Sequence, residues 1–322
     1  MKIAIVSTTY WTGLHEHMAK VFNRYTEHEA RVLSPGYWDT RKRFNPEYTQ
    51  QGCVYSVVDP DTRNEILEWA DVIQLAYTCS LHTLGRDDLL GKKVVSWFLG
   101  TRWKAELQRL FPGDQAKQVR FIYGCEGWER YPTGPYEWTV VPVLFPIEEP
   151  AWMPIPWENR RKIASMAPRA LGDLSQTGQR ISAPRSPQVV TGLLRGAKVP
   201  FDRLHNRKFP FCMARKAMAW VGIDDLVNPL VHKSGMEYLA VGTPCLNRWD
   251  SYVEGRFRDL TGGPKPPFVN TTIPTLVKTV KRALKANESL WRRRSGECRH
   301  WMETYYHPRE MVKYYIDLYT RS

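Results

Sequence analysis

The sequence predicts an α/β protein built from two doubly wound, Rossmann-like domains that face each other across a cleft. Three observations support this fold class. Strand-like and helix-like segments alternate along the chain, and the alternation restarts after a proline-rich stretch. The chain of 322 residues is also long enough for two domains of about 150 residues. Its hydrophobic fraction of 43% and charged fraction of 25% are those of a globular protein.

The first half of the chain predicts a parallel sheet. Residues 2–7 form a continuous apolar run, which is typical of a strand covered on both faces. An apolar repeat at helical spacing follows, formed by Leu14, Met18, Val21, Phe22 and Tyr25. Further strands are predicted over residues 30–35, 71–78, 92–100, 119–125 and 138–146. Strands separated by helical stretches indicate βαβ units.

Prolines mark the boundary between the two predicted domains. A stiff stretch contains Pro142, Pro146, Pro150, Pro154 and Pro156. After it, strands are predicted over residues 162–168, 199–206, 218–223, 244–249 and 266–270, and helices over 186–196, 209–217, 234–242, 273–287, 289–306 and 308–319. We therefore expect an N-terminal domain over residues 1–150, a C-terminal domain over 151–305, and a C-terminal helix over 306–322 that packs back on the N-terminal domain.

Positive charge is concentrated in the second half. Residues 151–322 hold 29 lysines and arginines against 14 acids, whereas the first 150 residues hold 17 against 19. This asymmetry favours a phosphate-rich ligand, a nucleic acid, or both. The alternative is a solvated basic surface, because runs such as 292–294 can simply face water.

Several classes of protein are disfavoured. No apolar run approaches the roughly 20 residues that span a bilayer, and the first residues lack a leader's cleavage site, so we expect a soluble cytoplasmic protein with no membrane partner. The six cysteines show no metal-ligand spacing, which argues against structural zinc and a disulfide framework. No GxGxxG follows Val6 or Ala167 and no GxxxxGK[ST] occurs, which disfavours dehydrogenases and P-loop NTPases.

The segment HKSGMEYLAVGTP, residues 232–244, contains a single acid, Glu237, in a sequence otherwise suited to a core. Ser234 is predicted to cap a helix that Gly242, Thr243 and Pro244 end. A carboxylate can accept hydrogen bonds from both cis hydroxyls of a ribose, and the free N–H groups of a helix start attract phosphate. The alternative is an exposed acid favoured by the helix dipole.

The same segment resembles the donor-binding segment of GT-B glycosyltransferases, which has the pattern E-x-(small/apolar)-x-x-G-x-P. A narrower resemblance is to the bacteriophage DNA β-glucosyltransferase family, which transfers glucose from UDP-glucose to hydroxymethylated cytosine in DNA. It is carried by MKIAIVS at the start of the chain, LFPIEE (144–149), TGQRISAPRSPQVVTGLL (177–194) and MAWVGIDDLVNPLVHKSGME (218–237). The resemblance implies a GT-B fold with an acceptor-side N-terminal domain and a nucleotide-sugar-binding C-terminal domain. It also implies double-stranded DNA with modified bases as a partner, a UDP-sugar as co-substrate, and no cofactor.

The resemblance assigns donor-binding residues in the second domain. Glu237 corresponds to the glutamate that accepts hydrogen bonds from the ribose, and Ser234 stands where the relatives have an arginine, so Lys233 or His232 takes its place. The other donor-site residues it implies are Gly235 and Met236 beside the glutamate, and Arg169, Arg180 and Arg185 for the diphosphate, which suits guanidinium geometry.

Glu16 corresponds to a glutamate that holds the donor sugar. The aspartate that acts as base in the relatives is replaced here by Gly100–Thr101, although an inverting transfer needs a base. The base is then His15, Glu16 or Asp71, or the enzyme retains configuration and needs none. No metal is implied, because the only close acidic pair, 224–225, is predicted to flank a loop.

Aromatic and basic residues of the first domain are candidates for acceptor binding, since they suit stacking with an extruded base and contact with phosphate: Trp11, Arg102, Trp103 and Lys104. Ordinary core or rim packing is the alternative for the aromatic residues. The function predicted is transfer of a hexosyl or pentosyl group to a modified DNA base. A glycan, lipid or small-molecule acceptor is the second hypothesis, and a non-catalytic nucleic-acid-binding protein the third.

The charge asymmetry yields a testable prediction about the acceptor. If DNA is the acceptor, its affinity should fall with salt, log K losing about 0.9 per phosphate contact for each tenfold rise in salt. Neutralising Arg102 and Lys104 together should flatten this slope and leave UDP affinity unchanged, because both residues are assigned to the acceptor side. Duplex binding between about 50 and 200 mM salt measures the slope. Absence of binding at the low end, with and without UDP, would exclude a DNA acceptor.

Overall fold

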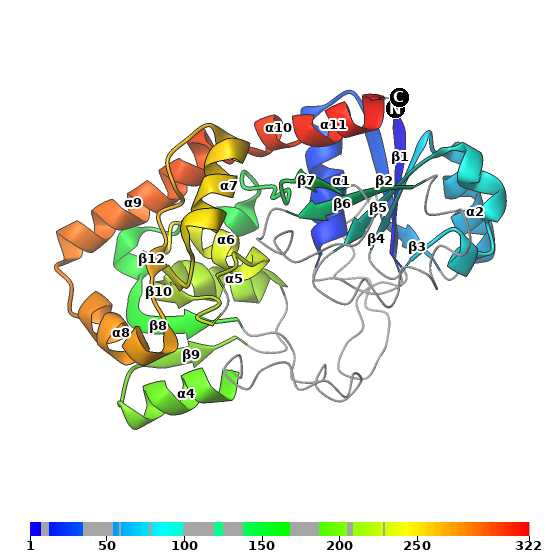
Figure 1. Ribbon diagram of the computed structural model, residues 1–322. Helices are drawn as coiled ribbons and strands as arrows, with labels where there is room; N and C mark the ends of the chain where they lie inside the picture. The colour runs from blue at the N-terminus through cyan, green and yellow to red at the C-terminus, as the bar shows by residue number, and fades with distance from the viewer. Residues whose placement is uncertain are drawn as a thin grey trace. The chain divides into compact units, whose positions relative to one another are not determined.

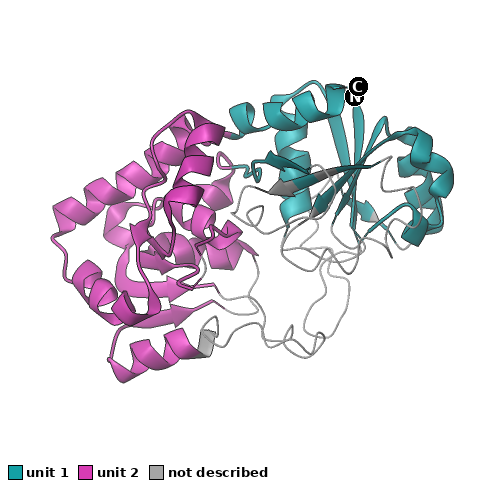
Figure 2. Ribbon diagram, in the orientation of Figure 1, with its two compact units in different colours: residues 1–146, 308–322 teal, residues 147–307 magenta. Residues whose placement is uncertain are grey.

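The structure, a computed structural model, describes residues 1–7, 13–34, 54–57, 59–76, 79–98, 119–124, 138–167, 187–204, 209–227 and 229–321. The chain divides into two compact units (Figure 2). Unit 1 combines Met1–Pro146 with Pro308–Ser322, and unit 2 is Ile147–His307. The sequence places the corresponding boundary after residue 150. The division into two units does not show which of them binds the acceptor and which binds the donor, so those roles stay predictions.

Unit 1 contains a seven-stranded sheet in the order β3-β2-β1-β4-β5-β6-β7, in which every neighbouring pair is parallel (Figure 1). The strands are β1 (Lys2–Val6), β2 (Glu29–Ser34), β3 (Val54–Ser56), β4 (Val72–Ala76), β5 (Lys93–Phe98), β6 (Val119–Gly124) and β7 (Trp138–Val141). The strand order reverses between β1 and β4. In doubly wound sheets, ligands bind beyond the carboxyl ends of the strands at such a reversal.

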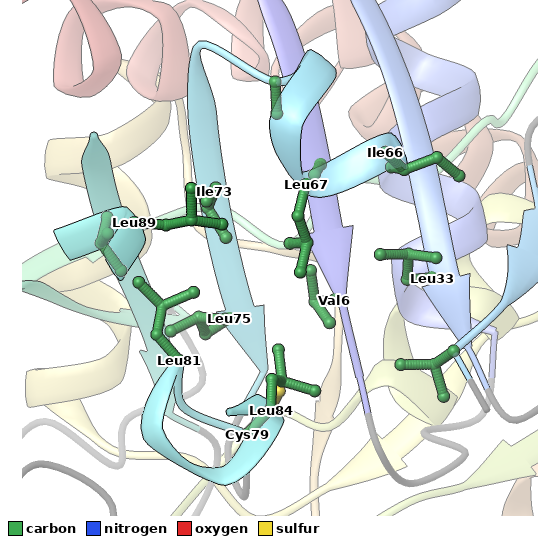
Figure 3. Packing of buried hydrophobic residues seen from close by; sticks show 14 of the residues in the cluster. Val6, Leu33, Ile66, Leu67, Ile73, Leu75, Cys79, Leu81, Leu84 and Leu89 are labelled. Atoms are coloured by element: carbon green, nitrogen blue, oxygen red, sulfur yellow. The ribbon is translucent and has the colours of Figure 1, made fainter. Parts of the chain in front are cut away.

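Helices cover both faces of this sheet. On one face, α2 (Pro60–Trp69) and the turns after β4 pack on the strands and form with them a core shown in Figure 3: Val6, Leu33, Ile66, Leu67, Ile73, Leu75, Cys79, Leu81, Leu84 and Leu89. On the other face lies α1 (Leu14–Tyr25), because Gln74, which alternates with Ile73 and Leu75, contacts the sulfur of Met18 at 3.0 Å. Cover on both faces explains why these strands are continuous apolar runs.

The last helices, α10 (Pro308–Met311) and α11 (Lys313–Thr320), pack on unit 1. Tyr319 is 1% exposed, stacks on Phe22 with ring centroids 5.8 Å apart, and donates a hydrogen bond to Gln74 Oε1. Lys93 Nζ donates to the Tyr319 carbonyl at 2.6 Å, and Arg120 donates to the Leu318 carbonyl at 2.9 Å. Two cations thus complement the negative end of α11.

Unit 2 contains a five-stranded parallel sheet in the order β12-β11-β10-β8-β9. Its strands are β8 (Arg161–Met166), β9 (Phe201–Arg203), β10 (Ala219–Ile223), β11 (Cys245–Asn247) and β12 (Val269–Asn270). Its helices are α4 (Pro187–Gly196), α5 (Phe209–Met218), α6 (Lys233–Ala240), α7 (Ser251–Thr261), α8 (Leu276–Leu284) and α9 (Glu288–Thr304). Here the strand order reverses between β8 and β10.

Short 3-10 turns complete the described part of the chain: His82–Leu84, Asp87–Gly91, Pro150–Trp152, Trp157–Asn159 and Ile273–Thr275. The predicted α/β class with two parallel, doubly wound sheets is confirmed. The sequence missed β3, α2 and α7. It also extended the strand that begins at Trp138 to residue 146, whereas this strand ends at Val141, before the first proline of the boundary. Among the described helices, none is both long and apolar enough to cross a membrane.

The packing of α11 predicts a large loss of stability for Tyr319→Ala. Truncation removes a buried ring that contacts Phe22 and Gln74, and aromatic-to-alanine changes in cores cost about 3–5 kcal/mol. Tyr314→Ala is the matched control on the same helix, because Tyr314 is 38% exposed and its loss should change stability by no more than about 0.5 kcal/mol. Native-state hydrogen exchange of the amides in α1 and β4 measures the unfolding of unit 1. Equal effects of the two substitutions would contradict the prediction.

Candidate functional site

The start of α6 lies at the carboxyl end of β10. Asp224, the residue after β10, accepts a hydrogen bond from the His232 amide at 3.1 Å. Asp225 accepts one from the Val227 amide at 2.8 Å, so the acidic pair flanks the β10–α6 loop, as predicted. A Cβ atom at Gly235 would lie 2.6 Å from Asp224 Oδ2, which shows how closely the first turn of α6 approaches this edge. The edge is where doubly wound sheets bind ligands.

The structure corrects the predicted helix start. The N-cap is His232, in extended conformation, and not Ser234. The Asp224 carboxylate fixes the chain at the His232 amide, while the Ser234 hydroxyl accepts a hydrogen bond from Lys216 Nζ at 2.9 Å. Glu237 therefore stands in the second turn. The predicted stop is confirmed, because Gly242 has φ 68° and donates to the Leu239 carbonyl at 2.9 Å.

Glu237 is a buried, ion-paired carboxylate. Its side chain is 9% exposed, its Oε2 contacts Lys216 Nζ, and its Oε1 lies 3.2 Å from Lys233 Nζ. Burial by itself raises the pKa of Glu237, but the charges and hydrogen bonds of Lys216 and Lys233 outweigh it and hold that pKa below its usual range. The alternative of an exposed acid near the helix dipole is therefore wrong. Two carboxylate oxygens offer about four acceptor positions, so two lysines leave room for further donors.

Lys216, which the sequence analysis did not single out, completes this group. It is 1% exposed on α5, and its ammonium lies 4.7 Å from the centroid of the Tyr238 ring. The Tyr238 hydroxyl shares a hydrogen bond of 2.9 Å with Ser165 on β8. The ring crosses β10 at Gly222, where a Cβ would lie 2.5 Å from Tyr238 Cγ. A glycine inside an apolar strand signals such a close approach, and this signal was available from the sequence.

Two buried arginines hold the other end of α6. Arg160 donates to the Val241 carbonyl and to Thr243 Oγ1, both at 2.9 Å. Arg299 of α9 donates to the Ala240 carbonyl at 2.7 Å. Burial lowers the pKa of Arg160 to about 10, which leaves it charged at neutral pH. These cations satisfy carbonyls that the last turn of a helix leaves without intrahelical partners.

The predicted catalytic residues His15 and Glu16 lie in the first turn of α1, which follows the carboxyl end of β1 beside the reversal of the unit 1 sheet. They are 3% and 5% exposed, and the His15 ring meets Trp97 edge-on with centroids 5.8 Å apart. Asp71 lies at the opposite edge, where its carboxylate accepts from the Lys2 amide at 2.7 Å, so it cannot act at the same place. The catalytic roles of His15 and Glu16 stay predictions.

The structure thus brings Lys233, Ser234, Gly235 and Glu237 together at one end of α6. Met236 is 3% exposed and belongs to the buried side of this helix. Other predicted site residues lie outside the described residues: Trp11, Arg102, Trp103, Lys104, Arg169, Arg180 and Arg185. Their roles stay predictions.

No protein-family model and no curated protein sequence matches this chain. Solved structures do match over its whole length. An α-glucosyltransferase in complex with UDP and a 13-mer DNA containing an HMU base has a TM-score of 0.67 and 11% identity, with 100% of both chains covered. An α-glucosyltransferase in complex with UDP-glucose and DNA containing an abasic site has a TM-score of 0.66 and 12% identity, covering 100% of this chain and 99% of that one.

A sucrose-phosphate synthase from Thermosynechococcus elongatus has a TM-score of 0.56 and 10% identity, with 100% of both chains covered. A protein from Anabaena in complex with UDP and glucose has a TM-score of 0.58 and 10% identity, covering 99% of this chain and 98% of that one. The chain therefore has the GT-B fold, as the sequence resemblance implied, and resembles an α-glucosyltransferase crystallised with DNA.

The contact between Gly222 and Tyr238 predicts opposite effects for two glycine substitutions in unit 2. Gly222→Ala places a methyl group against the ring and should cost about 1–3 kcal/mol, the usual cost of overpacking. Gly192→Ala in α4 meets nothing within 4 Å and should gain about 0.5–1 kcal/mol, because alanine favours helix over glycine. Hydrogen exchange of the β10 amides reports the stability of unit 2. A neutral Gly222→Ala variant would show that Tyr238 has room to move.

Proposed function

We propose that this protein is a nucleotide-sugar-dependent glycosyltransferase that moves a sugar from a UDP-sugar to a hydroxymethylated base in double-stranded DNA. One observation carries the proposal: an ionised, buried carboxylate, Glu237, stands near the start of α6 beyond the carboxyl end of β10. A buried carboxylate that keeps acceptor positions for hydroxyl donors suits the cis diol of a ribose. The full-length likeness to structures that contain UDP supports this assignment.

The donor would bind along the start of α6. Its ribose hydroxyls donate to Glu237, and its diphosphate lies against the first turn, where helix N–H groups point outward and favour anions. Gly235, whose Cβ position faces Asp224 and Phe268, is assigned to this first turn, and Lys233 adds a positive charge. Further charge neutralisation is assigned to Arg169, Arg180 and Arg185, so the proposal requires no metal or other cofactor.

Two observations support DNA as the acceptor. The structures crystallised with DNA have TM-scores of 0.66–0.67, whereas the sucrose-phosphate synthase and the Anabaena protein reach 0.56 and 0.58. The positive charge from residue 151 onward also suits a polyanion. A target base inside a duplex must be turned out of the stack before its hydroxymethyl group can react. Trp11, Arg102, Trp103 and Lys104 are assigned to this acceptor.

The transfer would use the carboxyl edge of the unit 1 sheet. Glu16 is assigned to the hydroxyls of the donor sugar, and His15 is the candidate base if the reaction inverts the anomeric centre. If the reaction retains configuration, no such base is needed. The replacement of the expected aspartate by Gly100–Thr101 agrees with either route.

The second hypothesis is a different class of acceptor, a glycan, lipid or small molecule. It is supported by the occurrence of the same fold in enzymes whose names specify other reactions. The sucrose-phosphate synthase matches over 100% of both chains, and a glycosyltransferase involved in lipopolysaccharide biosynthesis matches with a TM-score of 0.52 and 14% identity. A glycan, lipid or small molecule would then replace DNA, while the donor site would be unchanged. A non-catalytic nucleic-acid-binding protein on this scaffold is the third possibility.

The decisive experiment offers the protein UDP-glucose and two duplexes that differ only in a hydroxymethylated base. We expect UDP release and a mass gain of one hexose on the modified duplex alone. UDP release without DNA modification, on addition of a sugar or lipid acceptor, would favour the second class. No turnover with any UDP-sugar, together with salt-dependent DNA binding, would favour the non-catalytic protein.

Glu237→Ala should weaken UDP-sugar binding by about 1.5–3 kcal/mol, the scale of hydrogen bonds to a charged group. It should also lower stability, because it leaves the buried Lys216 ammonium without its carboxylate. Glu254→Ala on α7 is the control, because Glu254 pairs with Arg258 and Lys265 in the same unit and has no assigned role in donor binding. Calorimetric titration with UDP measures both variants. An unchanged UDP affinity of the Glu237 variant would remove Glu237 from the donor site.

A further inference from the structure

We propose that Lys216 is a positioning residue for Glu237. Lys216 fixes Oε2 of the carboxylate, and the ribose hydroxyls then replace the Lys233 ammonium as the donors to Oε1. This inference rests on the proposed function, since it assumes that Glu237 binds the donor ribose. It goes further by giving the two lysines different roles. Lys216 stays bound throughout, and Lys233 changes partner when the donor enters.

The geometry around Lys216 indicates a fixed side chain. Its ammonium contacts Glu237 Oε2, donates to Ser234 Oγ at 2.9 Å, and lies over the Tyr238 ring at 4.7 Å. The Tyr238 ring is itself held by its hydrogen bond to Ser165 and by its close contact with Gly222. Lys216 thus ties α5 to the first half of α6. Breaking a buried pair of this kind leaves an uncompensated charge.

Lys233 differs in position and exposure, although its ammonium also lies over an aromatic ring, that of Phe209, at 5.1 Å. It is the first residue of α6, its side chain is 12% exposed, and it reaches Glu237 Oε1 from one turn earlier on the same helix. Pairs between positions i and i+4 are individually weak where solvent screens them, and Lys233 is the more exposed of the two lysines. A ribose hydroxyl can therefore take the place of the ammonium at Oε1. Lys233, released at the start of the helix, then turns toward the diphosphate that the same ligand brings.

The charge of Glu237 depends on the groups around it. Lys216 faces it from α5 and Lys233 from α6, while Asp224 lies against Gly235 at the end of β10. The neighbouring Tyr238 phenol and Cys245 thiol both have pKa values raised by burial, so they are neutral. Without Lys216, burial raises the pKa of Glu237 against the charge of Lys233 alone. The carboxylate then takes up a proton as pH falls, and its ability to accept ribose hydroxyls is lost on the acidic side.

The test compares UDP with 2′,3′-dideoxy-UDP, which lacks both ribose hydroxyls. The ratio of their dissociation constants reports the ribose contact alone, because the phosphates titrate alike in both ligands. In the unmodified protein we expect a ratio of at least tenfold that is constant between about pH 5.5 and 8, since the pKa of Glu237 is held low. In Lys216→Met the ratio should fall toward one as the pH is lowered. Lys216→Arg restores the charge and should make the ratio independent of pH again.

Arg160→Met is the matched control. It also removes a buried cation that contacts α6, but at the carboxyl end of the helix and without touching Glu237. It should lower stability and leave the pH dependence of the ratio unchanged, which separates positioning from general destabilisation. If Lys216→Met does not fold, Lys216→Gln keeps hydrogen-bonding atoms without the charge and carries the same comparison.

The outcomes separate the two proposals. A folded Lys216→Met or Lys216→Gln protein with the unmodified ratio at every pH would overturn the role of Lys216. So would an unmodified protein whose ratio already falls within this pH range. If the unmodified protein binds UDP and dideoxy-UDP equally, or neither, then Glu237 does not bind ribose and the proposed donor site itself is wrong.

Discussion

The buried ion pair between Lys216 and Glu237 is the contact on which the candidate site depends. Two charges in a low-dielectric interior are stable only when their geometry is good and their remaining hydrogen-bonding capacity is used. Here Ser234 and the face of Tyr238 supply that environment for the ammonium. The space for Tyr238 exists because Gly222 has no side chain. Gly222 in β10 therefore makes room for the ring that packs against the ammonium paired with Glu237.

The two ends of α6 are held by different means. At its start the Asp224 carboxylate binds the N-cap amide, and at its end Arg160 and Arg299 bind carbonyls. These contacts come from β8, β10 and α9 or from residues adjoining them, so the helix is fixed to several neighbours at once. A ligand that binds such a helix loses little free energy to ordering the protein, which is the advantage of a preorganised site. Lys233, at the partly exposed start, is the group left to respond to the ligand.

Much of the fold was predictable because parallel strands covered on both faces are continuous apolar runs, as in Lys2–Val6 and Ala219–Ile223. The missed helix α2 buries only Ile66 and Leu67, too few to show a helical period. The missed α7 did carry signals at both ends, since Asp250 caps its start and Gly262 ends it with φ 63°. These cap signals were present in the sequence and were overlooked.

The site was predictable in part. Glu237 was found from its spacing to Gly242 and Pro244, a local pattern. Lys216 is 21 positions earlier, and nothing local links it to Glu237, because their contact depends on how α5 and α6 pack around β10. The N-cap was misplaced for the same reason: Ser234 is a favourable cap by type, but a carboxylate from the preceding strand fixes the chain at His232. Tertiary contacts decided both cases.

Unit 1 is discontinuous in the chain, and this affects the order in which the protein is completed during synthesis. Its sheet is made first, but Tyr315 and Tyr319, which cover Phe22 and Gln74, come from a segment translated after all of unit 2. At typical elongation rates of about 5–20 residues per second, roughly 160 residues of unit 2 delay that segment by about ten to thirty seconds. At the end of this interval unit 2 has all of its own residues, whereas the apolar surface of α1 still waits for its cover. The part of the molecule that begins first is therefore finished last.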